Sequence, residues 1–184
     1  SCTLDGNPYH KNSNSEWKNL FDGSSLDGWR HLGSDGQYHV ENGVIVGTAK
    51  TGYGNSFLTT QETYGDFILE LDVRVDPGLN SGVQFRSQSR DGDEHMYGYQ
   101  LEIDSSSRRW SGGIYDERRR SWLYNLSRNS RARSAFSPSA WNHMRIEVIG
   151  TSIRSWVNGI PAANLIDDMN LRGFIRLKVP SISN

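Results

Sequence analysis

The chain has 184 residues and a formal net charge of −1 at pH 7, so it has no general attraction for nucleic acid or for acidic surfaces. Its single cysteine, Cys2, excludes an internal disulfide, and no apolar run approaches the length of a membrane-spanning helix. Nineteen glycines and an aromatic content of 11% favour a turn-rich β protein.

Residues 1–15 are polar and have the composition of a flexible tether, so we expect a single domain over residues 16–184. No signal sequence is present, which fits a chain that is cytosolic or already processed. A cysteine that opens a polar tether resembles the processed end of a bacterial lipoprotein, where it carries lipid. On this interpretation the protein is exported and lies in the periplasm or is anchored to the outer membrane through Cys2. The alternative is a chance buried thiol.

Apolar and polar residues alternate in several short segments, whereas helical periodicity is scarce. The alternating segments are residues 67–75, 83–86, 97–104, 144–148 and 175–179. Asn42-Gly43 and Asn158-Gly159 stand between strand-like runs and favour two-residue hairpin turns, because both residue types tolerate positive φ. Only residues 165–171 suit a short helical turn. This pattern predicts an all-β sandwich of antiparallel strands.

Three of these segments carry a row of hydrogen-bonding and charged side chains opposite their apolar row. The rows are Gln84 and Arg86; Gln100, Glu102 and Asp104; and Arg176 and Lys178. If the three strands are neighbours, the rows merge into one polar surface, and nearby glycines such as Gly82 leave space for a ligand. Sugars are polar ligands of this kind. The alternative is the solvated outer face that any antiparallel sheet presents.

Residues 105–135 have weak strand character and are rich in arginine and aromatic residues. A long aromatic loop over a sheet predicts either a binding rim or a loop held down by its own aromatic side chains, and both interpretations stay open. Half of the arginines of the chain lie between Arg108 and Arg133. They suit surface ion pairs and loop anchoring, and a few are candidates to grip substrate oxygens with their planar fork of donors.

Glu102 and Asp104 lie two residues apart on one predicted strand. This spacing resembles the carboxylate pairs of sandwich-fold glycosidases, which serve as acid and nucleophile, although it also occurs by chance. The five histidines show no metal-ligand spacing and no convincing triad. Neither a glycine-rich phosphate loop nor a Gly-x-Ser-x-Gly nucleophile elbow is present.

A series of short motifs runs through the chain in a specific order. They are Trp17-Lys18-Asn19-Leu20-Phe21-Asp22-Gly23, Leu26-Asp27-Gly28-Trp29, Asn80–Arg86, Gly98–Asp104, Gly112–Asp116, Trp141-Asn142-His143, Trp156–Gly159 and Gly173-Phe174-Ile175. Together they resemble the 3-keto-disaccharide hydrolase domain family over about residues 16–179. The resemblance implies a concanavalin A-like jelly roll of two antiparallel sheets, one of them concave and polar. It also implies a bacterial protein of carbohydrate catabolism.

The implied activity is a hydrolase or lyase acting on glycosides or disaccharides already oxidised to a ketone at carbon 3. The ketone acidifies the proton on carbon 2, so the reaction needs a base, a clamp for the enediolate oxygen and an acid for the leaving oxygen. On matching positions the resemblance implies Glu102 or Asp104 as base or metal ligand, Arg86 as clamp and Tyr115 as acid. The implied sugar contacts are Gln84, Gln100, Trp110, Trp122, Arg176 and Lys178. No cofactor is certain, and a divalent metal ion stays open.

The chain departs from the family near its end. Where the family usually reads Leu-Gln-Val-His, this chain reads Leu177-Lys178-Val179-Pro180. Alternation would put the family's histidine, at the position of Pro180, on the same face as Lys178. Either Lys178 substitutes for this histidine, or the protein is impaired as an enzyme and is a non-catalytic carbohydrate-binding module. The family's usual last strand is also missing, which predicts an unpaired sheet edge unless Trp17–Phe21 covers it.

Overall fold

The computed structural model describes residues 17–51 and 54–181. The strands in these two ranges are β1 (Trp29–Gly33), β2 (Gln37–Glu41), β3 (Val44–Thr48), β4 (Ser56–Tyr64), β5 (Phe67–Val73), β6 (Asn80–Arg90), β7 (His95–Asp104), β8 (Ile114–Glu117), β9 (Ser121–Tyr124), β10 (Asn142–Ile149), β11 (Ser152–Val157), β12 (Ile160–Ile166) and β13 (Gly173–Val179). The predicted tether, with Cys2, lies outside the described residues, so lipid attachment and export stay predictions.

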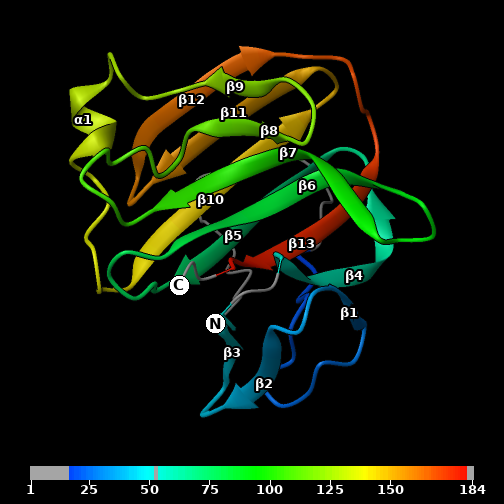
Figure 1. Ribbon diagram of the computed structural model, residues 1–184. Coiled ribbons are helices and arrows are strands. Elements are labelled where there is room, and N and C mark those ends of the chain that lie inside the picture. Colours follow the sequence, from blue (N-terminus) through cyan, green and yellow to red (C-terminus); the bar gives the residue numbers. More distant parts are fainter. Residues whose placement is uncertain (1–16, 52–53, 182–184) are drawn as a thin grey trace.

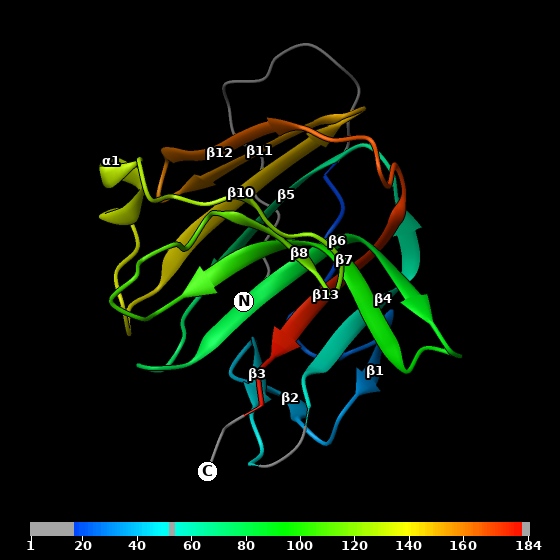
Figure 2. The same ribbon diagram turned by 45° about the horizontal axis from the view of Figure 1, so that its top comes forward.

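The strands form two facing antiparallel sheets and a separate hairpin (Figures 1 and 2). The larger sheet has the order β1-β4-β13-β6-β7-β8-β9, and the smaller sheet has the order β12-β11-β10-β5. Strands β2 and β3 pair only with each other among the described residues. The predicted all-β, concanavalin A-like sandwich is therefore confirmed.

The hydrophobic core lies between the two sheets. The apolar row of β7 contributes Tyr99, Leu101 and Ile103, each at most 2% exposed. The smaller sheet faces it with Leu69, Leu71, Met144, Ile146 and Val148. Burying each such side chain stabilises the fold by about 1.5–3 kcal/mol, so alternation along the strands largely sets which face turns inward.

Both predicted Asn-Gly turns close hairpins. Asn42 and Gly43 join β2 to β3 with φ of 51° and 75°, and Asn158 and Gly159 join β11 to β12 with φ of 48° and 78°. Positive φ at both central residues is typical of a type I′ turn, whose backbone twist matches the twist of the two paired strands.

The predicted helical turn at residues 165–171 is wrong. Pairing with β11 extends β12 to Ile166, and Asp167 then accepts a hydrogen bond from the backbone amide of Met169 (3.1 Å), which favours a bend over a helix. The short helix α1 lies instead at Ser130–Arg133, where the side chain of Asn129 caps it and Ala132 packs into the core. No helix in the described part of the chain has the length and apolarity needed to cross a membrane.

Strand β5 lies at one edge of the smaller sheet: within the described ranges it pairs with β10 alone. The segment Trp17–Phe21 lies beside β1 and β4 instead. Its Lys18 pairs with Glu62 (2.7 Å), and Trp29 donates a hydrogen bond to the carbonyl oxygen of Leu20 (2.6 Å). Among the described residues, the segment Trp17–Phe21 therefore does not pair with β5.

Gly112 lies where the larger sheet approaches the smaller one, and we predict that it tolerates no side chain. Its φ is +96°, and a Cβ would lie 2.6 Å from Val157 Cγ2 and 2.8 Å from Ala162 Cβ. Gly159 is a matched control, because its φ is +78° but a Cβ would meet nothing within 4 Å. Gly159→Ala should therefore lose only about 1–2 kcal/mol to backbone strain. Gly112→Ala should lose a further ~1–3 kcal/mol to overpacking. Urea denaturation measures both, and equal losses would contradict the proposed close contact.

Candidate functional site

Apart from Arg86, the residues of the predicted polar rows lie side by side on one face of the larger sheet, because β13, β6, β7 and β8 are consecutive neighbours. Arg176 pairs with Gln84, Gln84 with Gln100, and Gln100 with Tyr115. Directly opposed residues in antiparallel strands project to the same face, so these four side chains form one row across four strands.

A second row runs parallel to the first. Lys178 pairs with Gly82, and Gly82 pairs with Glu102. A Cβ on Gly82 would lie 2.6 Å from Cδ of Gln100. The space beside Gly82, which we expected a ligand to occupy, is therefore filled by the side-chain amide of Gln100. The glycine thereby lets Gln100 reach Glu102.

Glu102 is the most unusual ionisable group on this face. It is only 3% exposed, and its carboxylate accepts hydrogen bonds from the side-chain amides of Asn80 (2.5 Å) and Gln100 (3.1 Å). Burial raises the pKa of Glu102, although the charge of Lys178 and these two amides oppose the shift. A carboxyl group whose pKa is shifted towards neutrality is suited to take up and release a proton.

Asp104 has the opposite environment. Burial acts to raise its pKa, but hydrogen bonds from Ser106, Arg108 and the amide of Trp110 lower the pKa of Asp104 overall. One oxygen accepts from Arg108 Nε at 2.8 Å and from the backbone amide of Trp110 at 3.2 Å. The two carboxyl groups on β7 are thus driven apart in pKa, and Asp104 stays ionised as an anchor for the following loop.

A directional chain of hydrogen bonds connects Arg176 to Glu102. Arg176 Nε donates to Ser87 Oγ (2.9 Å), Ser87 donates to Gln84 Oε1 (2.6 Å), and Gln84 Nε2 donates to Gln100 Oε1 (3.4 Å). Gln100 then donates to Glu102. Burial lowers the pKa of Arg176 to about 10, which leaves it charged at neutral pH. This chain of hydrogen bonds therefore begins at the cation Arg176, as donor, and ends at the carboxylate of Glu102, as acceptor.

The side chain of Lys178 is more exposed than the side chains of the hydrogen-bond chain that starts at Arg176. Its Nζ is 3.9 Å from an oxygen of Glu117, and the two side chains are 9% and 16% exposed. Gln84, Gln100 and Arg176 are each at most 1% exposed. Lys178 is therefore the more accessible of the two cations that β13 places on this face.

The predicted aromatic residues lie beside these rows and pack against one another. Trp110 and Trp122 meet edge to face with ring centroids 4.9 Å apart, and Tyr115 meets Trp122 in the same manner at 5.2 Å. The guanidinium of Arg108 lies over both tryptophan rings, at 4.8 and 5.1 Å. This packing supports a loop held down by its own aromatic side chains, with Tyr115 next to Gln100.

The structure does not bring Arg86 to this face. A bulge lies between Gln84 and Gln88, and Arg86 has a φ of +46°, so the alternation is broken at this residue. The guanidinium turns to the loops at one end of the sandwich, where it donates to the carbonyl oxygens of Gly65 (3.0 Å) and Gly150 (2.7 Å) and pairs with Asp66 (3.1 Å). The expectation that Arg86 shares a face with Gln84 is therefore wrong, and Ser87 takes its place.

Three residues of this face were missed from sequence. Asn80 lies two residues before Gly82, so the same alternation could have identified it. Glu117 lies two residues after Tyr115 and carried the same signal. Ser87 carried none, because the bulge that brings it in depends on the left-handed conformation of Arg86.

The described residues do not fit a divalent metal ion. In residues 17–51 and 54–181, no three His, Cys, Asp or Glu side chains gather as metal ligands. The oxygens of Glu102 accept hydrogen bonds from two amide donors, and the charges that lower the pKa of Glu102 are the cations Lys178 and Arg108. We therefore derive no step through a metal.

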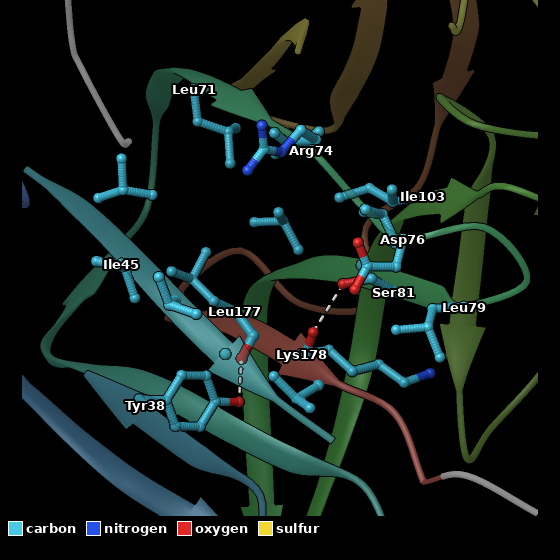
Figure 3. A pocket seen from close by; sticks show the side chains of 18 of the residues that line it. Tyr38, Ile45, Leu71, Arg74, Asp76, Leu79, Ser81, Ile103, Leu177 and Lys178 are labelled. Atoms are coloured by element: carbon cyan, nitrogen blue, oxygen red, sulfur yellow. Dashed lines mark hydrogen bonds between the residues drawn. The ribbon is translucent and has the colours of Figure 1, made fainter. Parts of the chain in front are cut away.

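A cavity of about 580 Å³ opens on the opposite side of the larger sheet (Figure 3). It is lined by core-facing residues such as Val83, Ile103 and Leu177, which alternate with the polar rows. The cavity and the polar face thus use the same strands, and Lys178 is also among the residues that line the cavity, whereas Glu102 lies on the polar face.

The chain belongs to the 3-keto-alpha-glucoside-1,2-lyase-like domain family, whose model matches residues 16–181. This confirms the resemblance found in the sequence motifs. A comparison with curated protein sequences found no match.

Solved structures share the fold at low sequence identity. Carbohydrate-binding module CBM66 from Bacillus subtilis is 15% identical with a TM-score of 0.63, over 86% of this chain and 91% of the module. A galectin-like protein of unknown function from the same organism is 11% identical with a TM-score of 0.63, over 83% of each chain. A β-1,3-1,4-glucanase from a mouse hindgut metagenome is 13% identical with a TM-score of 0.52, over 84% of this chain and 80% of the enzyme. The fold is therefore one that glycosidases and carbohydrate-binding modules share.

Gly82→Ala should disrupt the face by displacing Gln100. The added methyl group would overlap Cγ and Cδ of a buried side chain, so we expect a loss of about 1–3 kcal/mol of unfolding free energy. Gly54→Ala is the control, since its nearest neighbour would be a serine oxygen at 3.7 Å. The double variant Gly82→Ala/Gln100→Ala should recover part of the loss, because it restores the space. Additive losses in urea denaturation would show that the two positions do not interact.

Proposed function

We propose that the protein is a carbohydrate-active hydrolase or lyase that cleaves 3-keto-glycosides or 3-keto-disaccharides. Membership in the 3-keto-alpha-glucoside-1,2-lyase-like family supports this substrate class. The observation that carries the proposal is Glu102, a buried carboxyl group of raised pKa with a lysine ammonium nearby. This pair offers a base and a cation on one face, and proton abstraction next to a ketone needs both.

The reaction begins at carbon 2 of the sugar, whose proton is acidified by the ketone at carbon 3. Glu102 takes this proton, the electron pair of the broken C–H bond forms a double bond between carbon 2 and carbon 3, and the carbonyl electron pair moves to the ketone oxygen to give an enediolate. Collapse of the enediolate breaks the bond between carbon 1 and the leaving oxygen, which takes a proton from the general acid and departs. Water then adds its hydroxyl to carbon 1, Glu102 returns its proton to carbon 2, and the remaining proton of the water restores the general acid, so the net reaction is hydrolysis.

Lys178 replaces Arg86 as the clamp for the enediolate oxygen in this proposal. It is a mobile cation that shares a face with Glu102 and lies nearer to solvent, whereas Arg86 is engaged with the loops at the end of the sandwich. Tyr115 supplies the proton to the leaving oxygen, since it pairs with Gln100 and lies at the edge of the same face. Glu102 is held in position by the hydrogen-bond chain that includes Arg176, Gln84 and Gln100.

A second candidate is a non-catalytic carbohydrate-binding module. It is favoured by the hydrogen bonds that occupy both oxygens of Glu102 and by the ion pair that engages Asp104. In a binding module these carboxylates are structural, and sugar hydroxyls contact Lys178, Tyr115 and Trp122 at the rim. Such a protein binds saccharide without releasing product.

The deciding experiment is incubation with a 3-keto-glucoside and measurement of aglycone release by wild type and Glu102→Gln. Loss of a general base should lower kcat/KM by about 10²–10⁴-fold. Glu147→Gln is the control: it is a buried carboxylate of the smaller sheet, paired with Arg145 and Arg154, and its loss should leave turnover in place. Circular dichroism establishes that both variants fold. Saturable sugar binding without product release by the wild type would refute catalysis and support the binding module.

The pH profile distinguishes the two carboxyl groups. The base must be ionised, so kcat/KM should rise with pH and level off once it is deprotonated. Because burial raises the pKa of Glu102, the midpoint of this rise should lie above the ordinary glutamate value of about 4.3. Hydrogen bonding lowers the pKa of Asp104, so a midpoint below about 3.9 would instead identify Asp104 as the base.

A further inference from the structure

Arg108 is a cation beside the polar face that has no part in the proposed reaction so far. It lies in the loop that follows β7, its side chain is 39% exposed, and its Nε donates to Asp104. Within the described part of the chain its two Nη atoms donate no hydrogen bond, and neither is buried. The guanidinium has five N–H donors, so the four on its Nη atoms are available to another molecule.

The guanidinium of Arg108 is held in place, unlike that of a mobile surface arginine. Asp104, which accepts from Nε at 2.8 Å, has a side chain that is only 2% exposed. The planar group also lies over the rings of Trp110 (4.8 Å) and Trp122 (5.1 Å), an arrangement that attracts a cation. Because its plane and one edge are fixed, the Nη donors are oriented before any ligand arrives.

Glu102 lies between Arg108 and the second cation, Lys178. The ammonium of Lys178 is 3.9 Å from Glu117, which belongs to β8 and pairs with the first half of β7. Arg108 is bound to Asp104, the last residue of β7. The two cations therefore lie towards opposite ends of the strand that carries Glu102. Both are close enough for their charges to lower the pKa of Glu102.

A base between two cations matches the demands of elimination from a 3-keto sugar. Carbon 2, which loses the proton, lies between carbon 3 with the ketone oxygen and carbon 1 with the leaving oxygen. Negative charge develops first on the ketone oxygen and then on the leaving oxygen, and each is stabilised by a fixed donor or cation. Lys178 serves the ketone oxygen, which leaves Arg108 for the leaving oxygen. The acid Tyr115 is on that side too, because both it and Arg108 pack against Trp122.

We propose that Arg108 is a catalytic residue that binds the leaving oxygen on carbon 1 while Tyr115 protonates it, an inference that rests on the proposed function. In this step the enediolate reverts to the ketone, its carbon–carbon double bond moves to carbons 1 and 2, and the electron pair of the C1–O bond goes to the leaving oxygen. Tyr115 gives its proton to that oxygen. Arg108 stays protonated and stabilises the charge, which is greatest when the leaving group is a sugar or another alcohol.

The test compares two leaving groups, using methyl and 4-nitrophenyl 3-keto-glucosides. Arg108→Gln should lower kcat/KM for the methyl glycoside by about 10²–10³-fold, the usual loss of one such donor. The nitrophenyl glycoside should lose far less, because nitrophenolate departs without help. Arg108→Lys should recover part of the loss, since it keeps the charge but not the fork. Arg109→Gln, at the exposed neighbouring residue, is the matched control and should leave both rates unchanged. Equal losses on both substrates would mean that Arg108 only anchors its loop, and would overturn the proposal.

Proton abstraction is measured separately with a 3-keto sugar analogue that has hydrogen in place of the leaving oxygen. NMR in D₂O follows exchange at carbon 2, which wild type should catalyse and Glu102→Gln should not. Arg108→Gln should exchange at a rate similar to that of wild type. Because the charge of Arg108 lowers the pKa of Glu102, the rates are compared where both have levelled off with pH.

These measurements separate a failure of this inference from a failure of the proposed function. If Arg108→Gln loses exchange along with cleavage, Arg108 acts on Glu102 and not on the leaving oxygen, and the inference is overturned while the proposed function stands. If wild type neither exchanges the proton nor releases an aglycone, the proposed function is wrong and this inference falls with it.

Discussion

The polar face depends on one constraint: a guanidinium and a carboxylate are both buried, and neither has the other as a direct partner. Burying an unpaired charge costs several kcal/mol, and removing a partner from a buried charged group costs about 3–5 kcal/mol. Arg176 and Glu102 meet this constraint through three neutral side chains, Ser87, Gln84 and Gln100, that pass hydrogen bonds in one direction. In a chain with a cation at the donor end and an anion at the acceptor end, each bond polarises the next.

This constraint explains local features that the strand pattern alone does not. Gly82 is needed because the amide of Gln100 lies where its Cβ would be. The bulge at Arg86 is needed because a regular strand would place this arginine on the same face as Gln84. The hydrogen-bond chain requires a small hydroxyl there, and Ser87 supplies it by accepting from Arg176 and donating to Gln84. The displaced arginine is then used at the end of the sandwich to join three loops through their carbonyl oxygens and Asp66.

The regular part of the fold could be predicted from sequence because period-2 alternation and Asn-Gly turns are local signals. They gave the core row of β7, the hairpins at Asn42 and Asn158, and the convergence of Arg176, Gln84 and Gln100. Alternation fails where backbone conformation changes within a strand, as at Arg86, and no composition signal marks that residue.

Asp104 shows a second limit of sequence reasoning. Its spacing from Glu102 predicts a carboxylate pair, but the loop that follows folds back and supplies donors from Arg108 and Trp110, which fix it as an anion. The contrast in pKa between these two carboxyl groups comes from tertiary contacts, because both lie on one strand and both are buried.

The strands β13 and β6 carry two surfaces of opposite character at alternate residues. On β13, Arg176 and Lys178 face the polar side, while Leu177 and Val179 line the cavity on the core side. Because side chains alternate along a strand, a one-residue shift in the register of β13 would exchange these two faces. The bulges in β6 and β13 lie next to Arg176, so the register of these strands is fixed where the hydrogen-bond chain begins. Beyond that point, towards Val179, β13 is held on both sides, because Lys178 pairs with Phe57 of β4 and with Gly82 of β6. This pairing keeps Lys178 on the same face as Glu102.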